Sequence, residues 1–193
     1  MRKRTKIEPK ILITGASGIL GIQLMKVFPD ALHPTREEMN ITDRNSVLKY
    51  IEENKPNICI HAAALADIRR SETDKNLAWA TNVYGTLNIV KAMPIGTYFV
   101  YVSTACVFSG EEGNYDEESI PNPKNFYSLT KLCGEQIVRA AELIYLIVRT
   151  NFVAKEKWKY PKAFRDRYGT YLWAHQVAEG IKKLVDRKII GTV

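Results

Sequence analysis

The 193-residue sequence has no long hydrophobic run. None of its apolar stretches approaches the roughly 18 uninterrupted residues that a membrane-spanning helix needs. The N-terminal segment Met1–Lys6 is basic and lacks the apolar part of a secretory signal. We therefore expect a cytoplasmic protein with no membrane partner. Because 46% of the residues are hydrophobic, the chain can bury one good-sized core.

Cysteine and histidine are also scarce, at three residues each. The cysteines form no CxxC pair and lie in apolar or helical sequence: Cys59, Cys106 and Cys133. The histidines are scattered, without a histidine or cysteine partner at helical i, i+4 spacing: His33, His61 and His175. This pattern predicts reduced cysteines that serve in packing, and no metal site.

The formal net charge of +7 could attract nucleic acid or anionic substrates. The first ten residues alone hold five basic groups against Glu8, a net charge of +4. Most of the excess therefore belongs to one tail. We interpret this tail as a solvated chain end, and expect no nucleic-acid partner.

The clearest motif is a glycine-rich turn between a strand and a helix. Ile11–Thr14 is a short apolar run typical of a buried strand, and Gly15, Gly18 and Gly21 follow it at once. A segment with helical apolar spacing, residues 19–28, comes next. In such a turn the glycines allow a tight bend and close backbone approach, and the helix N-terminus attracts phosphates. The alternative is a turn that merely connects two elements.

Strands and helices alternate along the first 150 residues. Strands are expected at 31–35, 57–61, 98–102 and 143–148, and helices through 47–51 and over 76–93 and 126–142. This order predicts an α/β fold, a Rossmann-type doubly wound parallel sheet. Ligands bind such sheets beyond the carboxyl ends of the strands. The glycine turn, His61–Ala64, Ser103–Thr104 and Arg149–Thr150 should therefore converge on one cleft.

Tyr127 and Lys131 have the i, i+4 spacing of neighbours on a helix, with Cβ atoms roughly 5–6 Å apart. A free tyrosine has a pKa of about 10, and a nearby cation favours its phenolate. Lys131 is therefore predicted to tune Tyr127 as the acid that protonates a carbonyl oxygen during hydride transfer. Of the hydroxyl pair Ser103 and Thr104, we favour Thr104 as the second donor. The alternative is an exposed helical pair without a catalytic role.

Together these segments resemble the extended short-chain dehydrogenase/reductases, most closely those similar to dTDP-4-dehydrorhamnose reductase. The resemblance covers about residues 10–152. It is carried by Ile13 to Gly21, His61–Ala64, Asn82 to Thr86, Val102 to Gly110, Asn125 to Glu135, and Val148 to Thr150. It implies a catalytic trio of Thr104, Tyr127 and Lys131, with Asn82 in support.

The same resemblance implies the residues that surround a dinucleotide. The expected cofactor contacts are Gly15, Ser17, Gly18, Ile19, Leu20, Gly21, Arg36, Asn40, Ile41, Ala62, Ala63, Ala64, Asn82, Tyr127 and Lys131. Asn40 is a departure, because an aspartate is common at that position. No acid ends the second strand to bind a ribose 2′-hydroxyl, whereas Arg36 could accept a 2′-phosphate. NADPH is therefore favoured over NADH; an ordinary surface arginine is the alternative.

The end of the chain differs from the family pattern. Family members usually continue further, and their later portion forms much of the substrate site. We expect a dinucleotide-binding domain over 1–150 and a shortened substrate-side region over 151–193, with the weaker Arg167–Gly169 segment and a helix within it. The analogy predicts reduction of a nucleotide-activated sugar, dTDP-4-dehydrorhamnose-like. A homodimer is also expected. The alternative is a non-catalytic NADP-binding regulatory subunit.

Overall fold

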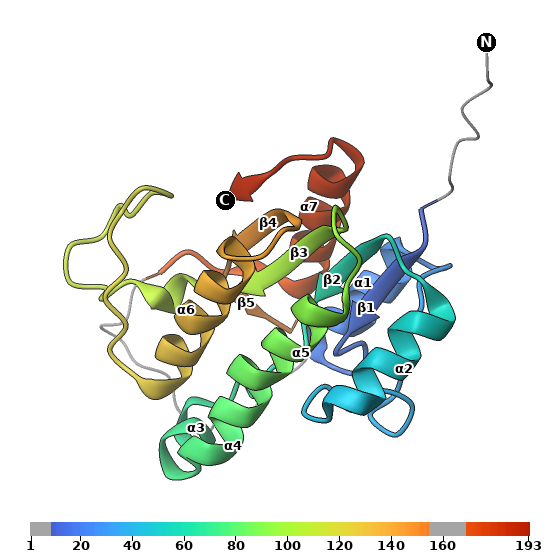
Figure 1. Ribbon diagram of the computed structural model, residues 1–193. Coiled ribbons are helices and arrows are strands. Elements are labelled where there is room, and N and C mark those ends of the chain that lie inside the picture. The colour runs from blue at the N-terminus through green and yellow to red at the C-terminus, as the bar shows by residue number, and fades with distance from the viewer. Residues whose placement is uncertain (1–8, 155–168) are drawn as a thin grey trace.

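The computed structural model describes residues 9–154 and 169–193. Within these ranges the main sheet has five strands in the order β1-β2-β3-β4-β7, and every pair of neighbours is parallel. The strands are β1 (Ile11–Thr14), β2 (Ile58–His61), β3 (Tyr98–Ser103), β4 (Ile144–Arg149) and β7 (Gly191–Thr192). The predicted α/β fold with a Rossmann-type parallel sheet is confirmed (Figure 1).

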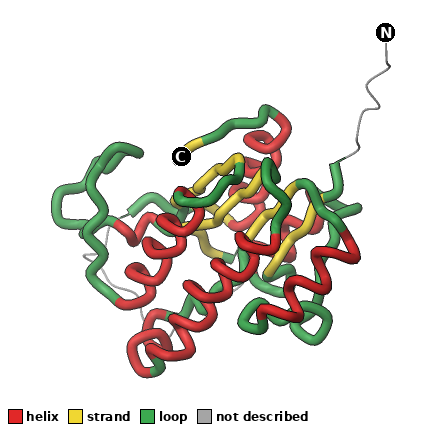
Figure 2. The backbone as a smooth tube through the Cα atoms, in the orientation of Figure 1, coloured by secondary structure: helices red, strands yellow, loops and turns green. Residues whose placement is uncertain are grey.

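Helices cover both faces of this sheet (Figures 1 and 2). One buried cluster joins α1 (Ile19–Val27) and α7 (Ala174–Asp186) to the sheet, through residues such as Leu24 and Ile181. The other face is covered by α2 (Arg44–Asn54), α5 (Gly85–Ala92) and α6 (Phe126–Arg139). The strands are apolar on both sides because both of their faces are buried.

The strand expected over 31–35 is reduced to a single parallel bridge between Leu12 and Leu32. Leu32 donates its N–H to Ile11 and accepts from the N–H of Ile13, each at 2.8 Å. Pro34 has no N–H to offer the ladder, which explains why pairing stops there. The bridge still places the following residues beside β1.

The helix expected over 76–93 is interrupted. It consists of α4 (Lys75–Trp79), a π-helical turn η1 (Ala80–Tyr84) and α5, and Met93 ends it before Pro94. The Thr86 hydroxyl donates to the carbonyl oxygen of Asn82 at 2.6 Å, and so competes with the regular backbone ladder. π-Helical turns are frequent at functional sites. The preceding short helix α3 (Ile68–Thr73) was not predicted.

Three further elements complete the described chain. A 3-10 turn, η2 (Ala105–Val107), follows β3, and β5 (Phe152–Val153) pairs with β6 (Leu172–Trp173) in a small parallel sheet. The predicted Arg167–Gly169 segment lies mostly outside the described residues. The predicted boundary at residue 150 stays a prediction, although α7 packs on α1 and β7 extends the main sheet. No helix of the described ranges is long and apolar enough to cross a membrane.

Candidate active site

The glycine turn leaves space at the carboxyl end of β1 that side chains would fill. Gly15 has a φ of +73°, and a Cβ on it would lie 2.7 Å from the backbone nitrogen of Ala63. A Cβ on Gly21 would lie 2.1 Å from the carbonyl oxygen of Gly15. Gly15 therefore allows the turn to approach the segment after β2, and Gly21 allows α1 to pack against the turn.

The N-terminus of α1 opens onto this turn without a side-chain cap. Gly18 is the N-cap residue and makes no side-chain hydrogen bond to the first helical turn. Ser17, Gly18 and Ile19 are exposed, whereas Leu20 is buried in the core. Free N–H groups and the positive end of the helix dipole suit a diphosphate, so these residues fit a dinucleotide.

The alanine run after β2 forms the neighbouring wall. The N–H of Ala62 donates to the carbonyl of Thr14 at 3.3 Å, and the N–H of Ala63 donates to the Thr14 hydroxyl at 3.2 Å. Ala62, Ala63 and Ala64 are all partly exposed. Their small side chains therefore lie against the turn without closing it.

His61 links this wall to the π-helical turn. Its Nδ1 is 2.7 Å from the Thr14 hydroxyl, and its Nε2 is 3.1 Å from the Thr86 hydroxyl. Because Thr86 gives its only proton to the Asn82 carbonyl, it must accept from Nε2–H. This places a proton on Nε2, and in the neutral ring Nδ1 accepts from the Thr14 hydroxyl. Burial, and to a smaller extent the charge of Lys131, lowers the pKa of His61 to about 3.

This shift predicts a loss of stability in acid. The folded-state pKa lies below the ordinary value of 6.5, so the unfolded chain takes up the proton first as the pH falls. The free energy of unfolding should decrease from about pH 6.5 towards pH 3, by on the order of 4 kcal/mol at the lower end. Urea unfolding of the wild type and His61→Gln at several pH values measures this. The advantage of the wild type should shrink in acid; parallel curves would contradict the assignment.

Asn82 continues the hydrogen-bond network to α6. Its Oδ1 accepts from the N–H of Leu65 at 2.7 Å, and its Nδ2 donates to the Leu65 carbonyl at 3.2 Å and to the Thr130 hydroxyl at 2.9 Å. Thr130 in turn donates to the carbonyl of Tyr127 at 2.7 Å. Asn82 thus joins the segment after β2 to the turn of α6 that carries Tyr127, and its supporting role in catalysis stays a prediction.

Tyr127 lies in the first turn of α6, which Asn125 caps by accepting from the N–H of Ser128 at 2.8 Å. Burial raises the pKa of Tyr127 well above its ordinary value, and Cys106 raises it further. The nearby Thr104 side chain acts in the opposite direction and lowers this pKa. The structure therefore brings the two predicted hydroxyl groups together.

Lys131 is only 2% exposed, and its Nζ lies 4.0 Å from the centre of the Tyr101 ring. Burial lowers the pKa of Lys131 to about 7, while Glu135 raises it. The predicted lowering of the Tyr127 pKa by Lys131 is not observed. A lysine with a pKa near 7 is neutral at the pH where a buried phenol titrates. The catalytic assignment of both residues stays a prediction.

A buried ion pair behind Lys131 was not predicted from the sequence. Glu135 is fully buried, and Arg149 donates to both its carboxylate oxygens, with Nη2 2.8 Å from Oε2. The Ser103 hydroxyl donates to Oε1 at 2.6 Å. This cluster fixes α6 against the carboxyl ends of β3 and β4. Ser103 is therefore engaged in the scaffold, which leaves Thr104 as the hydroxyl beside Tyr127.

The predicted adenine-side residues lie after the Leu32 bridge. Arg36 is exposed. The Asn40 Oδ1 accepts from the N–H and the hydroxyl of Thr42, at 3.1 and 2.9 Å. Ile41 packs beside Gly85: a Cβ added to Gly85 would lie 2.9 Å from the Cδ1 atom of Ile41. Asn40 therefore shapes a local turn, and its contact with a cofactor stays a prediction.

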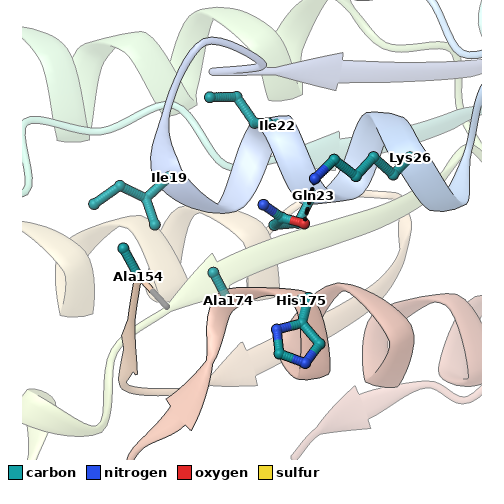
Figure 3. A pocket seen from close by; sticks show the side chains of 7 residues that line it. All are labelled: Ile19, Ile22, Gln23, Lys26, Ala154, Ala174 and His175. Carbon is teal, nitrogen blue, oxygen red and sulfur yellow. Dashed lines mark hydrogen bonds between the residues drawn. The ribbon is translucent and has the colours of Figure 1, made fainter. Parts of the chain in front are cut away.

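A small pocket lies elsewhere, between α1 and the start of α7 (Figure 3). It is lined by Ile19, Ile22, Gln23, Lys26, Ala154, Ala174 and His175. Among these described residues, only Ile19 belongs to the predicted cofactor contacts. The pocket is therefore separate from the hydroxyl pair at Tyr127.

A family model described as the RmlD substrate binding domain matches residues 9–192. The chain belongs to this family. The match confirms the resemblance inferred from the glycine, Thr104 and Tyr127 motifs. It also extends past residue 152, as far as residue 192.

Several curated proteins are similar to this chain. Bovine methionine adenosyltransferase 2 subunit beta is 34% identical over 152 residues, which are 72% of this chain and 46% of the relative. The dTDP-4-dehydrorhamnose reductase of Aggregatibacter actinomycetemcomitans is 32% identical over 154 residues, 76% of this chain and 52% of the relative. The chain thus spans about half the length of these curated relatives.

Solved structures agree with the RmlD assignment. The dTDP-4-dehydrorhamnose reductase of Bacillus anthracis, in complex with NADP, superposes with a TM-score of 0.84 at 30% identity. The superposition covers 95% of this chain and 73% of that one. The UDP-glucose 4-epimerase of Thermus thermophilus, at 18% identity and a TM-score of 0.79, supports the fold alone.

Proposed function

We propose that this chain binds NADP(H) at the glycine turn and reduces a carbonyl group of a nucleotide-activated sugar. The observation that supports this most strongly is that the half-buried Tyr127 lies near Thr104, whose side chain lowers its pKa, at the place where α6 packs on η2. This pair stands on a scaffold that hydrogen bonds connect to the glycine turn through His61 and Asn82.

In this proposal the N-terminus of α1, which begins at Ile19, holds the diphosphate. The exposed guanidinium of Arg36 binds a ribose 2′-phosphate, which favours NADPH over NADH. The Bacillus anthracis relative, crystallised with NADP, supports this preference. Lys131 holds the ribose of the nicotinamide half.

The reduced nicotinamide, when bound, supplies a hydride to the carbonyl carbon. The raised pKa keeps Tyr127 protonated, so its hydroxyl can donate the proton that the carbonyl oxygen takes up. Thr104 donates a second hydrogen bond to the same oxygen and stabilises its developing negative charge. The carbonyl compound leaves as an alcohol.

The test begins with the cofactor. Titration with NADPH should quench tryptophan fluorescence and raise the melting temperature, because ligand at 100 times Kd stabilises a protein by about 2.7 kcal/mol. NADH should bind more weakly. Absence of any response to either nucleotide would remove the basis of the proposal.

Turnover is tested next with a panel of nucleotide-activated keto sugars, including dTDP-4-dehydrorhamnose. We expect that at least one member of the panel oxidises NADPH. The reaction is monitored through the fall in NADPH absorbance. The similarity to methionine adenosyltransferase 2 subunit beta favours a second candidate, a non-catalytic NADP-binding subunit. NADPH binding without oxidation by any panel member would favour that candidate.

A homodimer and a cytoplasmic location belong to the same proposal. Sedimentation tests the homodimer, and microscopy of the tagged chain tests the location.

A further inference from the structure

Tyr101, on β3, contacts Lys131 twice although no sequence motif singled it out. Its side chain is fully buried, and the Nζ of Lys131 lies over its ring, 4.0 Å from the ring centre. Its hydroxyl donates a long hydrogen bond, 3.3 Å, to the main-chain carbonyl of Lys131. One residue of the sheet therefore contacts both the charged end and the backbone of the lysine that is proposed to hold the ribose.

Gly134 leaves the space that this ring occupies. A Cβ on Gly134 would lie 2.0 Å from the hydroxyl oxygen of Tyr101 and 2.6 Å from the ring carbon that carries it. Lys131 and Gly134 are three residues apart on α6 and so share one face of the helix. The Tyr101 ring therefore packs directly on the backbone of α6, where the Lys131 side chain can lie over it.

The charged groups near Lys131 leave the ring as the partner of its ammonium. Glu135, one turn further along α6, is already bound by the guanidinium of Arg149. In the part of the chain that the structure describes, no ion pair joins a carboxylate to the Lys131 Nζ. The nearby His61 is neutral, because its pKa is lowered to about 3. A buried ammonium needs compensation, and the face of an aromatic ring attracts a cation most strongly where water is excluded.

We propose that Tyr101 is a positioning residue for Lys131: the face of its ring holds the ammonium at the point from which Lys131 binds the ribose of the nicotinamide half. This inference rests on the proposed function. Burial alone favours the neutral amine, whereas the electron-rich face of the ring favours the charged form. Removing electron density from the ring should therefore weaken its hold on the ammonium and lower the pKa of Lys131.

Fluorinated phenylalanines at position 101 test this proposal, because ring fluorines weaken cation binding and change the shape of the ring little. Tyr101→Phe is the reference, since it keeps the ring and loses only the hydroxyl. The lysines are labelled with 13Cε, and the signal of Lys131 is assigned by its absence in Lys131→Arg. In the cofactor-free protein, difluoro- and trifluorophenylalanine should lower the pKa of Lys131 stepwise, by about one pH unit for the trifluoro ring. A pKa that does not follow the number of fluorines would overturn the proposal.

Phe99 provides the matched control. It lies two residues earlier on the same strand, on the same face of the sheet, and is also fully buried. Among the contacts of the described residues, the cation–π contact of Lys131 is with Tyr101 and none is with Phe99. Trifluorophenylalanine at position 99 should leave the pKa of Lys131 unchanged. A general effect of fluorine in the core would lower this pKa equally from both positions, and would count against Tyr101.

Titration with NADPH separates this inference from the proposed function. If Lys131 binds the ribose as an ammonium, the Kd for NADPH above neutral pH should rise along the fluorine series, by up to about tenfold, because the charged fraction of Lys131 falls. A pKa that follows the fluorines with an unchanged Kd would support the contact with the ring and contradict the ribose-binding role of Lys131. The pKa itself is measured without cofactor or turnover, so it decides the role of Tyr101 even if the chain reduces no substrate.

Discussion

Replacing Tyr127 by phenylalanine is expected to lower kcat by about 10²–10⁴-fold, the usual contribution of a positioned general acid. The change removes only the hydroxyl group, which lies near Thr104. The ring remains, and the glycine turn binds the other end of the cofactor, so the Kd for NADPH should change little. Steady-state kinetics with a panel substrate and fluorescence titration with NADPH measure the two effects separately.

Tyr84→Phe provides the matched control. Tyr84 lies at the end of the π-helical turn, and its side chain is 55% exposed. Loss of its hydroxyl should leave both kcat and the NADPH affinity close to wild type. If Tyr127→Phe retained turnover at the level of Tyr84→Phe, the role of Tyr127 as the proton donor would be wrong.

Gly15→Ala is expected to reduce NADPH affinity at least tenfold, which corresponds to about 1.4 kcal/mol. An alanine there must adopt a φ near +73°, and its Cβ would lie within 2.7 Å of the backbone of Ala63. Because backbone is the obstacle, the turn itself must move, and the diphosphate site moves with it. Isothermal titration with NADPH and thermal unfolding separate the loss of binding from the loss of stability.

Alanine substitutions at two other glycines serve as controls, one for backbone strain and one for a change in stability. Gly96 has a φ of +78° with nothing within 4 Å of an added Cβ, so Gly96→Ala reports backbone strain alone. Gly180 lies in α7 with open space around it, and Gly180→Ala should stabilise the protein by about 0.5–1 kcal/mol. Neither should alter NADPH binding. Equal binding by Gly15→Ala and Gly96→Ala would show that the turn does not hold the diphosphate.

Features that depend on local sequence were predicted well. The apolar runs of β1 and β3, the glycine spacing before α1 and the helix that carries Tyr127 are determined by neighbouring residues. The strand expected at 31–35 is shorter than predicted, because Pro34 has no N–H to continue the pairing. The break in the helix over 76–93 was missed because it depends on the side chains of Asn82 and Thr86, which hydrogen-bond to partners distant in sequence.

The supporting residues of the site could not be predicted either, because their contacts join segments that are distant in sequence. Glu135 resembles an ordinary helical glutamate, and its burial becomes apparent only when β4 places Arg149 beside it. The predicted direction of the pKa shift of Tyr127 is wrong. Burial raises this pKa, and the effect of burial is larger than any effect of the nearby Lys131. Asn151, whose Oδ1 accepts from the Thr104 hydroxyl at 3.3 Å, lies 47 residues from Thr104, and only the parallel order of β3 and β4 brings the two together.

The central claim is that a cofactor held at the glycine turn delivers hydride to a carbonyl compound beside Tyr127. Single turnover with NADPH deuterated at the transferable position of the nicotinamide, in the presence of dTDP-4-dehydrorhamnose, tests it most directly. Mass spectrometry should find one deuterium on the carbon that carried the carbonyl group, and Tyr127→Phe should slow its appearance. If NADPH is bound and all the deuterium stays in the cofactor for every nucleotide-activated keto sugar tried, the chain is not the proposed reductase.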